Sequence, residues 1–316
     1  MKLCDFDKWE KIAAYDFKEE IVGFQAEDDA IDRVMIYQAF WLKGEKDKNI
    51  VSGDEVEEIA AKYRDSRKST RESDNCALAN EVYRLLWDKS LLKICTSGDT
   101  MNSWKTTWNA LFAPHKSRLQ QCGRLSGLKK VRGWSIRASM LVYSAEKEKF
   151  KQIIRDCPGA EKFLSLCYTL GNFIPIPPQF QSRGTSSLRD YWDLSLACIY
   201  NYYMQKKCPV DMTELHHPII GKPYTLEWMV GEKNLVQCEK WLSFFPCWEV
   251  FVQKNFLESF VENSYGPPKP LWEGHFTGPV LPKKPEQFKS FFTNAAGWIT
   301  KRGEKMADAL REKTIP

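Results

Sequence analysis

The apolar positions of the chain recur at helical spacing over most of its length. In residues 77–92, the apolar side chains of Leu78, Val82 and Leu85 fall on one face of a helix. Residues 286–313 show the same spacing, which predicts a long amphipathic helix near the end of the chain. Further helices are predicted over residues 28–42, 103–112, 146–155, 160–168, 188–206, 236–245 and 249–263.

Strand patterns are fewer. Residues 134–143 alternate between apolar and polar side chains, and residues 91–95 form a short apolar run that is typical of a buried strand. Residues 170–178 are expected to be extended, because a residue that precedes proline is disfavoured in a helix. The sequence therefore predicts an α+β fold that is predominantly helical with a small mixed sheet.

Two stretches interrupt these patterns. Residues 64–75 contain no apolar side chain, and residues 265–285 are rich in proline and glycine, so both are expected to be irregular. A chain of 316 residues exceeds the size that one core usually reaches. The first stretch suggests an N-terminal helical region at 1–75 and a main helical domain with the small sheet at 76–316, although one continuous domain fits the pattern as well.

The positive charge of the chain is concentrated in one segment. The net charge of +5 does not by itself call for a nucleic-acid partner. Residues 101–145, however, hold eight basic and no acidic side chains, interleaved with Trp104, Trp108 and Trp134. This mixture suits a nucleotide or nucleic acid, although a basic solvent-facing side of a helix explains it too. The basic residues that would contact such a partner are Lys116, Arg118, Arg124, Lys129, Lys130 and Arg132.

The cysteines and histidines indicate no metal site. None of the ten cysteines forms a C-x-x-C pair, the four histidines have no zinc-ligand spacing, and no cofactor motif is present. Cys198 lies in an apolar run, where a reduced thiol packs as a small apolar group. No signal peptide or membrane span is visible, since acidic residues lie near the first residue and no apolar run reaches about 18 residues. We therefore expect a soluble cytoplasmic protein without a membrane association.

The first candidate for chemistry is the polar run at residues 97–100. If this run is a turn before a helix, Ser97 and Thr100 could hold an anion with their amides, and Asp99 could orient a proton or a metal ion. A simpler interpretation is that Asp99 caps the helix that follows.

A second candidate follows the helix predicted at 160–168. Thr169 and Asn172 flank Gly171, which suits the glycine that often ends a helix. An asparagine that holds two loops together explains Asn172 better than a catalytic role. Arg183 lies in the next loop, where a guanidinium could bind phosphate or carboxylate, or only pair with an acid.

The third candidate is an acidic pair at the start of the helix predicted over 188–206. Asp190 and Asp193 are three residues apart, so they lie on one helix face, where two carboxylates could bind a divalent cation or act as acid and base. Acids in the first turn of a helix also stabilise it without any catalytic role, and Ser187 with Asp190 approximates a capping box.

Several of these motifs occur together in a known family. The motifs LWDK (86–89), SGDT (97–100), YTLGN (168–172), RG (183–184) and DYWDLSL (190–196) resemble a bacterial family that is classed as a domain of unknown function. The likeness continues through residues 251–261 and 301–303. Members of that family have a longer, asparagine-containing loop before the RG motif, and in this chain residues 179–182 form a shorter one. The resemblance implies a bacterial cytoplasmic setting and no particular reaction.

Two hypotheses follow. In the first, one polar cleft binds a phosphate-bearing ligand, either a nucleotide or a nucleic acid, and the protein could act as a hydrolase or a transferase. Asp99, Asp190 and Asp193 would act there as bases or metal ligands. Arg183, Asn172, Thr169, Ser97 and Thr100 would bind the ligand. In the second, the chain is a non-catalytic helical binding module of a phage-defence or toxin–antitoxin type system, and the basic segment and the C-terminal amphipathic helix bind its partner.

Overall fold

The structure is a computed structural model that describes part of the chain. Described are residues 77–95, 97–102, 158–166, 169–178, 180, 191–207, 216–217, 222–278, 280 and 282–314. The helices predicted over 28–42, 103–112 and 146–155, the strand predicted over 134–143 and the polar loop at 64–75 lie outside these residues. So do Arg183, Asp190 and the basic residues from Lys105 to Arg137.

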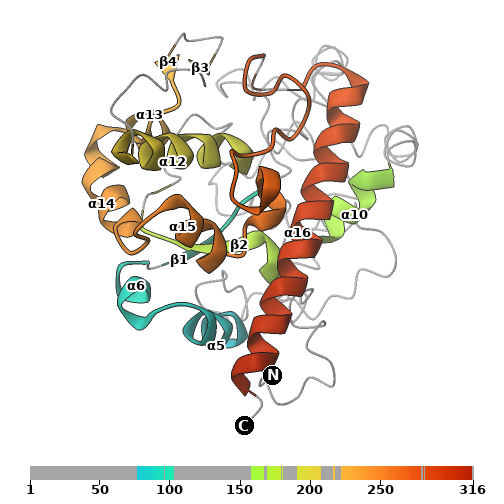
Figure 1. The fold of residues 1–316 in the computed structure, drawn as a ribbon. Helices are drawn as coiled ribbons and strands as arrows, with labels where there is room; N and C mark the ends of the chain where they lie inside the picture. Colours follow the sequence, from blue (N-terminus) through green and yellow to red (C-terminus); the bar gives the residue numbers. More distant parts are fainter. Residues whose placement is uncertain are drawn as a thin grey trace, which may run out of the picture.

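The longest element is the C-terminal helix α16 (Pro285–Thr314), which confirms the helix predicted there. It runs along one side of the described fold and contacts α10 (Pro158–Leu166) and α5 (Ala77–Leu86) (Figure 1). Its apolar side is turned inward, because Phe291, Ile299 and Leu310 are buried. The amphipathic pattern of this helix therefore reflects packing against its own chain.

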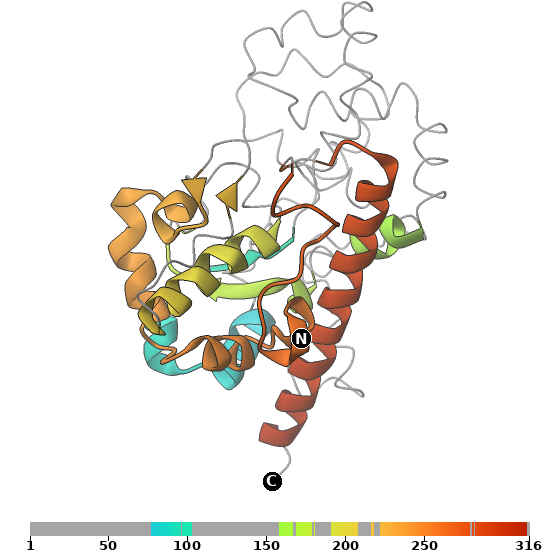
Figure 2. The same cartoon turned by 45° about the horizontal axis from the view of Figure 1, so that its top comes forward.

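A second group of helices packs around α12 (Trp192–Lys207). Nearly every residue in the first half of α12 is buried, which is typical of a helix that is covered on all sides. Figures 1 and 2 show it beside the helices that follow it in the chain and apart from α10. These helices are α13 (Leu226–Val230), α14 (Glu232–Leu242) and α15 (Trp248–Lys254).

Aromatic side chains fill the space between α12, α14 and α15. Trp241 meets Phe251 edge to face at 5.5 Å between ring centres, and Tyr203 lies 6.1 Å from Phe251. The Tyr203 hydroxyl donates hydrogen bonds to the carbonyls of Leu242 and Phe245. The aromatic pairs add to the energy of burial, so these helices form one core.

The described strands form two short antiparallel pairs. β1 (Ser97–Thr100) pairs with β2 (Phe173–Ile176), so that Ser97 lies opposite Ile176 and Thr100 lies opposite Phe173. β3 (His216–His217) pairs with β4 (Lys222–Pro223). The prediction of a predominantly helical fold with little sheet is confirmed, and the extended segment predicted at 170–178 contains β2.

Two local predictions were wrong. The apolar run at 91–95 belongs to helix α6 (Lys89–Ile94), which begins at Asp88, whose carboxylate accepts hydrogen bonds from the amides of Ser90 and Leu91. The Ser90 bond is the largest cause that lowers the Asp88 pKa. The run at 97–100 is a strand rather than a turn before a helix, because β2 offers it a backbone partner.

The helix predicted over 249–263 is also shorter than expected. α15 ends at Lys254, and two single 3-10 turns follow, η7 (Glu258–Phe260) and η8 (Glu262–Ser264). Phe256 and Asn263 have positive φ angles of 59° and 45°, which no right-handed helix accommodates. From residue 265 to residue 284 the described chain is irregular apart from a bridge between Val261 and Pro268, as its prolines and glycines predict.

The described cysteines are free of disulfide bonds. Burial raises the pKa of the Cys198 thiol well above its usual range, so this thiol is inert and packs as an apolar group, as expected. Among the described residues, no helix is both long enough and apolar enough to cross a bilayer.

Candidate functional site: a polar network in the core

The network begins at the 3-10 turn η6 (Leu170–Asn172), between α10 and β2. Asn172 is fully buried, and its side chain bonds the backbone of Asn102 twice: its Oδ1 accepts from the Asn102 amide at 3.1 Å, and its Nδ2 donates to the Asn102 carbonyl at 2.8 Å. The Met101 amide donates to the Asn172 carbonyl at 2.8 Å. Asn172 therefore holds together two segments that lie 70 residues apart in the sequence.

Asn102 extends this contact to the start of α12. Its Oδ1 accepts a hydrogen bond from the Trp192 amide at 3.1 Å. The first amides of a helix have no partner within the helix, so this bond caps α12 from a distant segment. Asn102 is fully buried and lies two residues after the end of β1.

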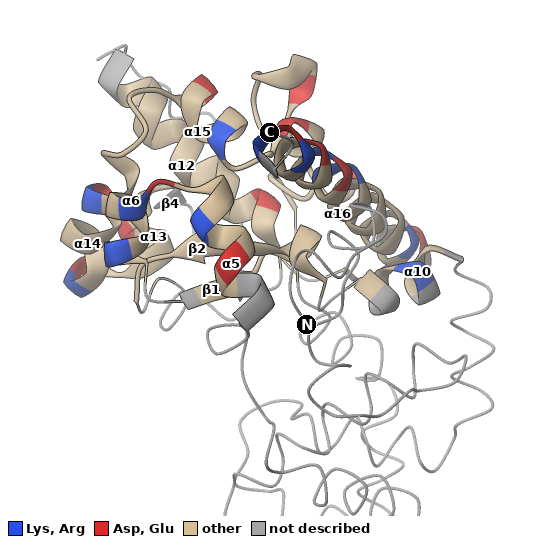
Figure 3. Ribbon diagram, turned by 90° about the horizontal axis from the view of Figure 1, so that it is seen from below, with Lys and Arg blue, Asp and Glu red and all other residues tan. Residues whose placement is uncertain are grey.

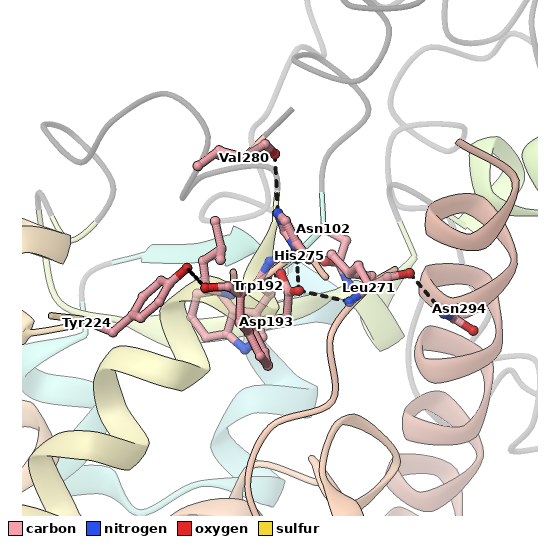
Figure 4. Close-up of polar contacts among 10 residues, drawn as sticks. Asn102, Trp192, Asp193, Tyr224, Leu271, His275, Val280 and Asn294 are labelled. Carbon is pink, nitrogen blue, oxygen red and sulfur yellow. Dashed lines mark hydrogen bonds and ion pairs between the residues drawn. The ribbon is translucent and has the colours of Figure 1, made fainter. Parts of the chain in front are cut away.

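Asp193, in the first turn of α12, is the acidic centre of the network (Figure 4). One carboxylate oxygen accepts from the Leu194 amide at 2.9 Å. The other accepts from the Leu271 amide at 2.9 Å and lies 2.6 Å from Nδ1 of His275. Asp193 is fully buried, so its partners replace the water that the carboxylate would otherwise bind.

His275 comes from the irregular segment 265–284. The Trp272 ring stacks on its imidazole with 3.6 Å between ring centres, and the Tyr191 ring meets it edge to face at 5.3 Å. Its Nε2 lies 3.2 Å from the carbonyl oxygen of Val280. The imidazole is thus buried on both faces and held at both nitrogens.

Arg302 closes the network on the side of α16. Its Nε donates to the Asn255 carbonyl, and its Nη1 donates to the carbonyls of Gly171 and Leu170. Burial lowers the pKa of Arg302 to about 9, which still leaves the guanidinium charged at neutral pH. We call Arg302, Asn172, Asn102, Asp193 and His275 the core polar network.

The close approach of α16 explains the glycine in the η6 turn. A Cβ atom on Gly171 would lie 2.8 Å from the carbonyl oxygen of Ile299 and 3.3 Å from the Cα of Gly303. Gly171 is therefore needed because two backbones touch there, and not because it ends a helix with a positive φ angle.

Most polar atoms of the described network are hydrogen-bonded within the protein, while Nδ2 of Asn102 and Nη2 of Arg302 are buried without a hydrogen-bond partner. A general base needs a lone pair within reach of a substrate proton, but both Asp193 oxygens are engaged by protein donors. In the described part of the chain, no three His, Cys, Asp or Glu side chains are grouped so that they could hold a metal ion. In this arrangement the network joins five parts of the fold and exposes no reactive group.

The network contains part of the predicted site. Asn172 bonds Asn102, which caps α12 at Trp192, the residue before Asp193, and all of these side chains are buried in the core. Thr169 caps the end of α10 by donating from Oγ1 to the Leu166 carbonyl at 2.8 Å. The remaining candidates that are described belong to β1, where Ser97 lies opposite Ile176, Asp99 opposite Ile174 and Thr100 opposite Phe173. Arg183 and Asp190 lie outside the described residues.

Three residues of the network were missed by the sequence predictions. Arg302 falls in a motif of the resemblance, at 301–303, but its burial had no signal in the spacing of the helix. His275 was considered only as a metal ligand, and its partner Asp193 lies 82 residues away. Asn102 lies two residues after the SGDT motif, and this position was its one signal in the sequence.

Comparisons with known proteins give no relative. No protein-family model, no curated protein and no solved structure matches the chain. The resemblance to the bacterial family of unknown function therefore remains a prediction.

Proposed function

We propose that the protein binds a phosphate-bearing ligand, a nucleotide or a nucleic acid, through its basic segment and Arg183. The observation that carries this proposal is the charge of residues 101–145, which hold eight basic and no acidic side chains. Such a run attracts phosphate groups over a long range and supplies donors for their oxygens.

The core polar network supports the proposal by the residues that it joins. Asn102 is the second residue of the basic segment 101–145, and Tyr191 and Trp192 follow the loop that contains Arg183. The hydrogen bond from the Trp192 amide to Asn102 fixes these two attachment points to one another. The chain therefore enters the basic segment and leaves the Arg183 loop at neighbouring points, which is compatible with a shared ligand.

The exposed face of α16 is a poorer candidate for phosphate binding. Lys301, Glu304, Lys305 and Asp308 alternate in sign along it (Figure 3). Because Lys305 is also paired with Glu258 at 2.9 Å, this face has no concentrated positive charge.

Binding of a fluorescein-labelled single-stranded oligonucleotide, with ATP as competitor, tests the proposal. For the triple variant Lys129→Ala, Lys130→Ala and Arg132→Ala we expect weaker binding and a slope of log K against log salt that is smaller by about 2, since each lost phosphate contact in a single strand contributes about 0.7. For Arg183→Ala we expect a loss of about tenfold or more, the size of one charge-assisted contact.

The matched control removes two lysines elsewhere. Lys233 and Lys240 are exposed on α14, so the double variant Lys233→Ala and Lys240→Ala is expected to bind as the unaltered protein does. The proposal would be contradicted if the unaltered protein did not bind the oligonucleotide at about 50 mM salt, where phosphate contacts are strong. It would also be contradicted if the control variant lost as much affinity as the triple variant.

A non-catalytic binding module, as in a defence or toxin–antitoxin type system, is the second candidate. One observation favours it: the Asp193 carboxylate, which would need a free lone pair to act as a general base, is engaged by the Leu194 and Leu271 amides and by His275. The C-terminal helix, which this candidate function would use to bind a partner, gives it no support, because the apolar side of α16 is already buried. Multiple turnover of ATP or of the oligonucleotide, lost in Asp99→Asn and Asp190→Asn, would favour an enzyme; binding without turnover would favour the module.

A further inference from the structure

The imidazole of His275 faces a hydrogen-bond acceptor at each nitrogen. Nδ1 lies 2.6 Å from the Asp193 carboxylate, and Nε2 lies 3.2 Å from the carbonyl oxygen of Val280. A backbone carbonyl cannot donate, so the contact with Val280 requires a proton on Nε2. The remaining question is which atom holds the proton between Nδ1 and Asp193.

Two backbone amides that donate to Asp193 decide where this proton lies. The Leu194 and Leu271 amides both donate to the Asp193 oxygens, which stabilises the ionised carboxylate. A proton between Asp193 and His275 therefore belongs on Nδ1, and the ring carries two N–H groups. A neutral ring would leave one nitrogen lone pair facing an oxygen lone pair in a fully buried place, where water offers no relief.

Other charged groups do not compete for this proton. From the segment 222–225, Tyr224 faces the pair, and burial, together with the Asp193 charge, raises its pKa, so it stays neutral. Tyr191 presents the edge of its ring, and α16 contributes Asn294, which donates to the Leu271 carbonyl at 2.9 Å. Of the nearby charged side chains that are described, Glu273 of the same segment and Lys289 of α16 are exposed.

We propose that Asp193 and His275 form a buried carboxylate–imidazolium pair, which acts as a proton-dependent lock between α12 and the segment 271–280. Two bonds attach this segment to Asp193, one from the Leu271 amide and one from the imidazole. The contact of the imidazole with the Val280 carbonyl lies within the segment and holds the ring in place. Loss of one proton from the ring breaks either the bond to Asp193 or the bond to Val280. In the first case the segment loses part of its attachment to the start of α12, and in the second case it loses the internal bond that holds the ring against Val280.

The first test is the protonation of the ring in the whole protein. Long-range proton–nitrogen correlation spectra of the ¹⁵N-labelled chain at pH 8 should show one histidine with two protonated nitrogens, and the variant His275→Gln should lack that signal. The other three histidines serve as internal references. Four neutral rings at pH 8 would overturn the proposal, because a free histidine is neutral there.

The second test is the pH dependence of stability. Both bonds of the imidazole need a proton on the ring nitrogen, whereas a histidine in an unfolded chain is neutral at pH 8. The unfolding equilibrium constant should therefore be larger at pH 8 than at pH 6, relative to that of His275→Gln measured in urea. Equal pH dependence of the two proteins would overturn the lock. If His275→Gln does not fold, the spectra of the unaltered protein still decide the matter.

Discussion

Replacing Gly171 with alanine is expected to destabilise the fold by about 3 kcal/mol, at the upper end of the range for overpacking. The added Cβ would lie 2.8 Å from the carbonyl oxygen of Ile299, and that oxygen belongs to the backbone of α16, which cannot rotate away. Arg302 holds the two segments together through its 2.8 Å bond to the Gly171 carbonyl, so relief by separation would also lengthen this bond. Urea denaturation measures the change in the free energy of unfolding.

Gly297 provides the matched control for this variant. It lies within α16, and a Cβ at this position would have no heavy atom within 4 Å. Gly297→Ala is therefore expected to stabilise the protein by about 0.5–1 kcal/mol, as alanine does within a helix. If Gly171→Ala were as stable as Gly297→Ala, the close approach of α16 to the η6 turn would be refuted.

Replacing Asp193 with asparagine is expected to cost about 3–5 kcal/mol, the range for breaking a buried ion pair on one side. The carboxylate accepts from the Leu194 and Leu271 amides and from His275. An asparagine must turn its NH₂ group toward one or more of these donors, which then lose their acceptor in a fully buried place. Urea denaturation at pH 7 checks this expectation.

An exposed carboxylate on the same chain provides a control that separates the effect of burial from the effect of removing a negative charge. Asp308 is paired with Arg311 three residues later on α16, and both side chains are solvent-accessible. Asp308→Asn is expected to change stability by about 0.5 kcal/mol or less. If Asp193→Asn kept full stability and instead lost binding or turnover of a ligand, Asp193 would belong to an active site rather than to the core.

The sequence predicted those features that depend on neighbours along the chain. The spacing of Phe291, Ile299 and Leu310 predicted α16, and the prolines after Asn172 predicted the extended β2, because both signals are local. The run at 91–95 was misassigned for the same reason: its apolar residues fit a strand or a buried helix, and the cap at Asp88 decides between them.

The candidate site was predictable only in part. Polar residues at the ends of elements marked Asn172 and Asp193, and the expectation that Asn172 ties loops together agrees with its bonds to Asn102. The partners themselves lie 70 to 90 residues away, and no periodicity links such positions. Burial of Asp193 was equally hidden, since an acid in the first turn of a helix is usually exposed.

Hydrogen exchange of four backbone amides tests the core polar network most directly. Each donates to a side-chain acceptor of the network: Asn102 to Asn172, Trp192 to Asn102, and both Leu194 and Leu271 to Asp193. The Ser90 amide, which donates to the exposed Asp88, is the reference for a side-chain acceptor at the surface. We predict that the four amides exchange only through global unfolding, as slowly as the most protected helical amides. Exchange of these amides as fast as that of Ser90 would contradict the account.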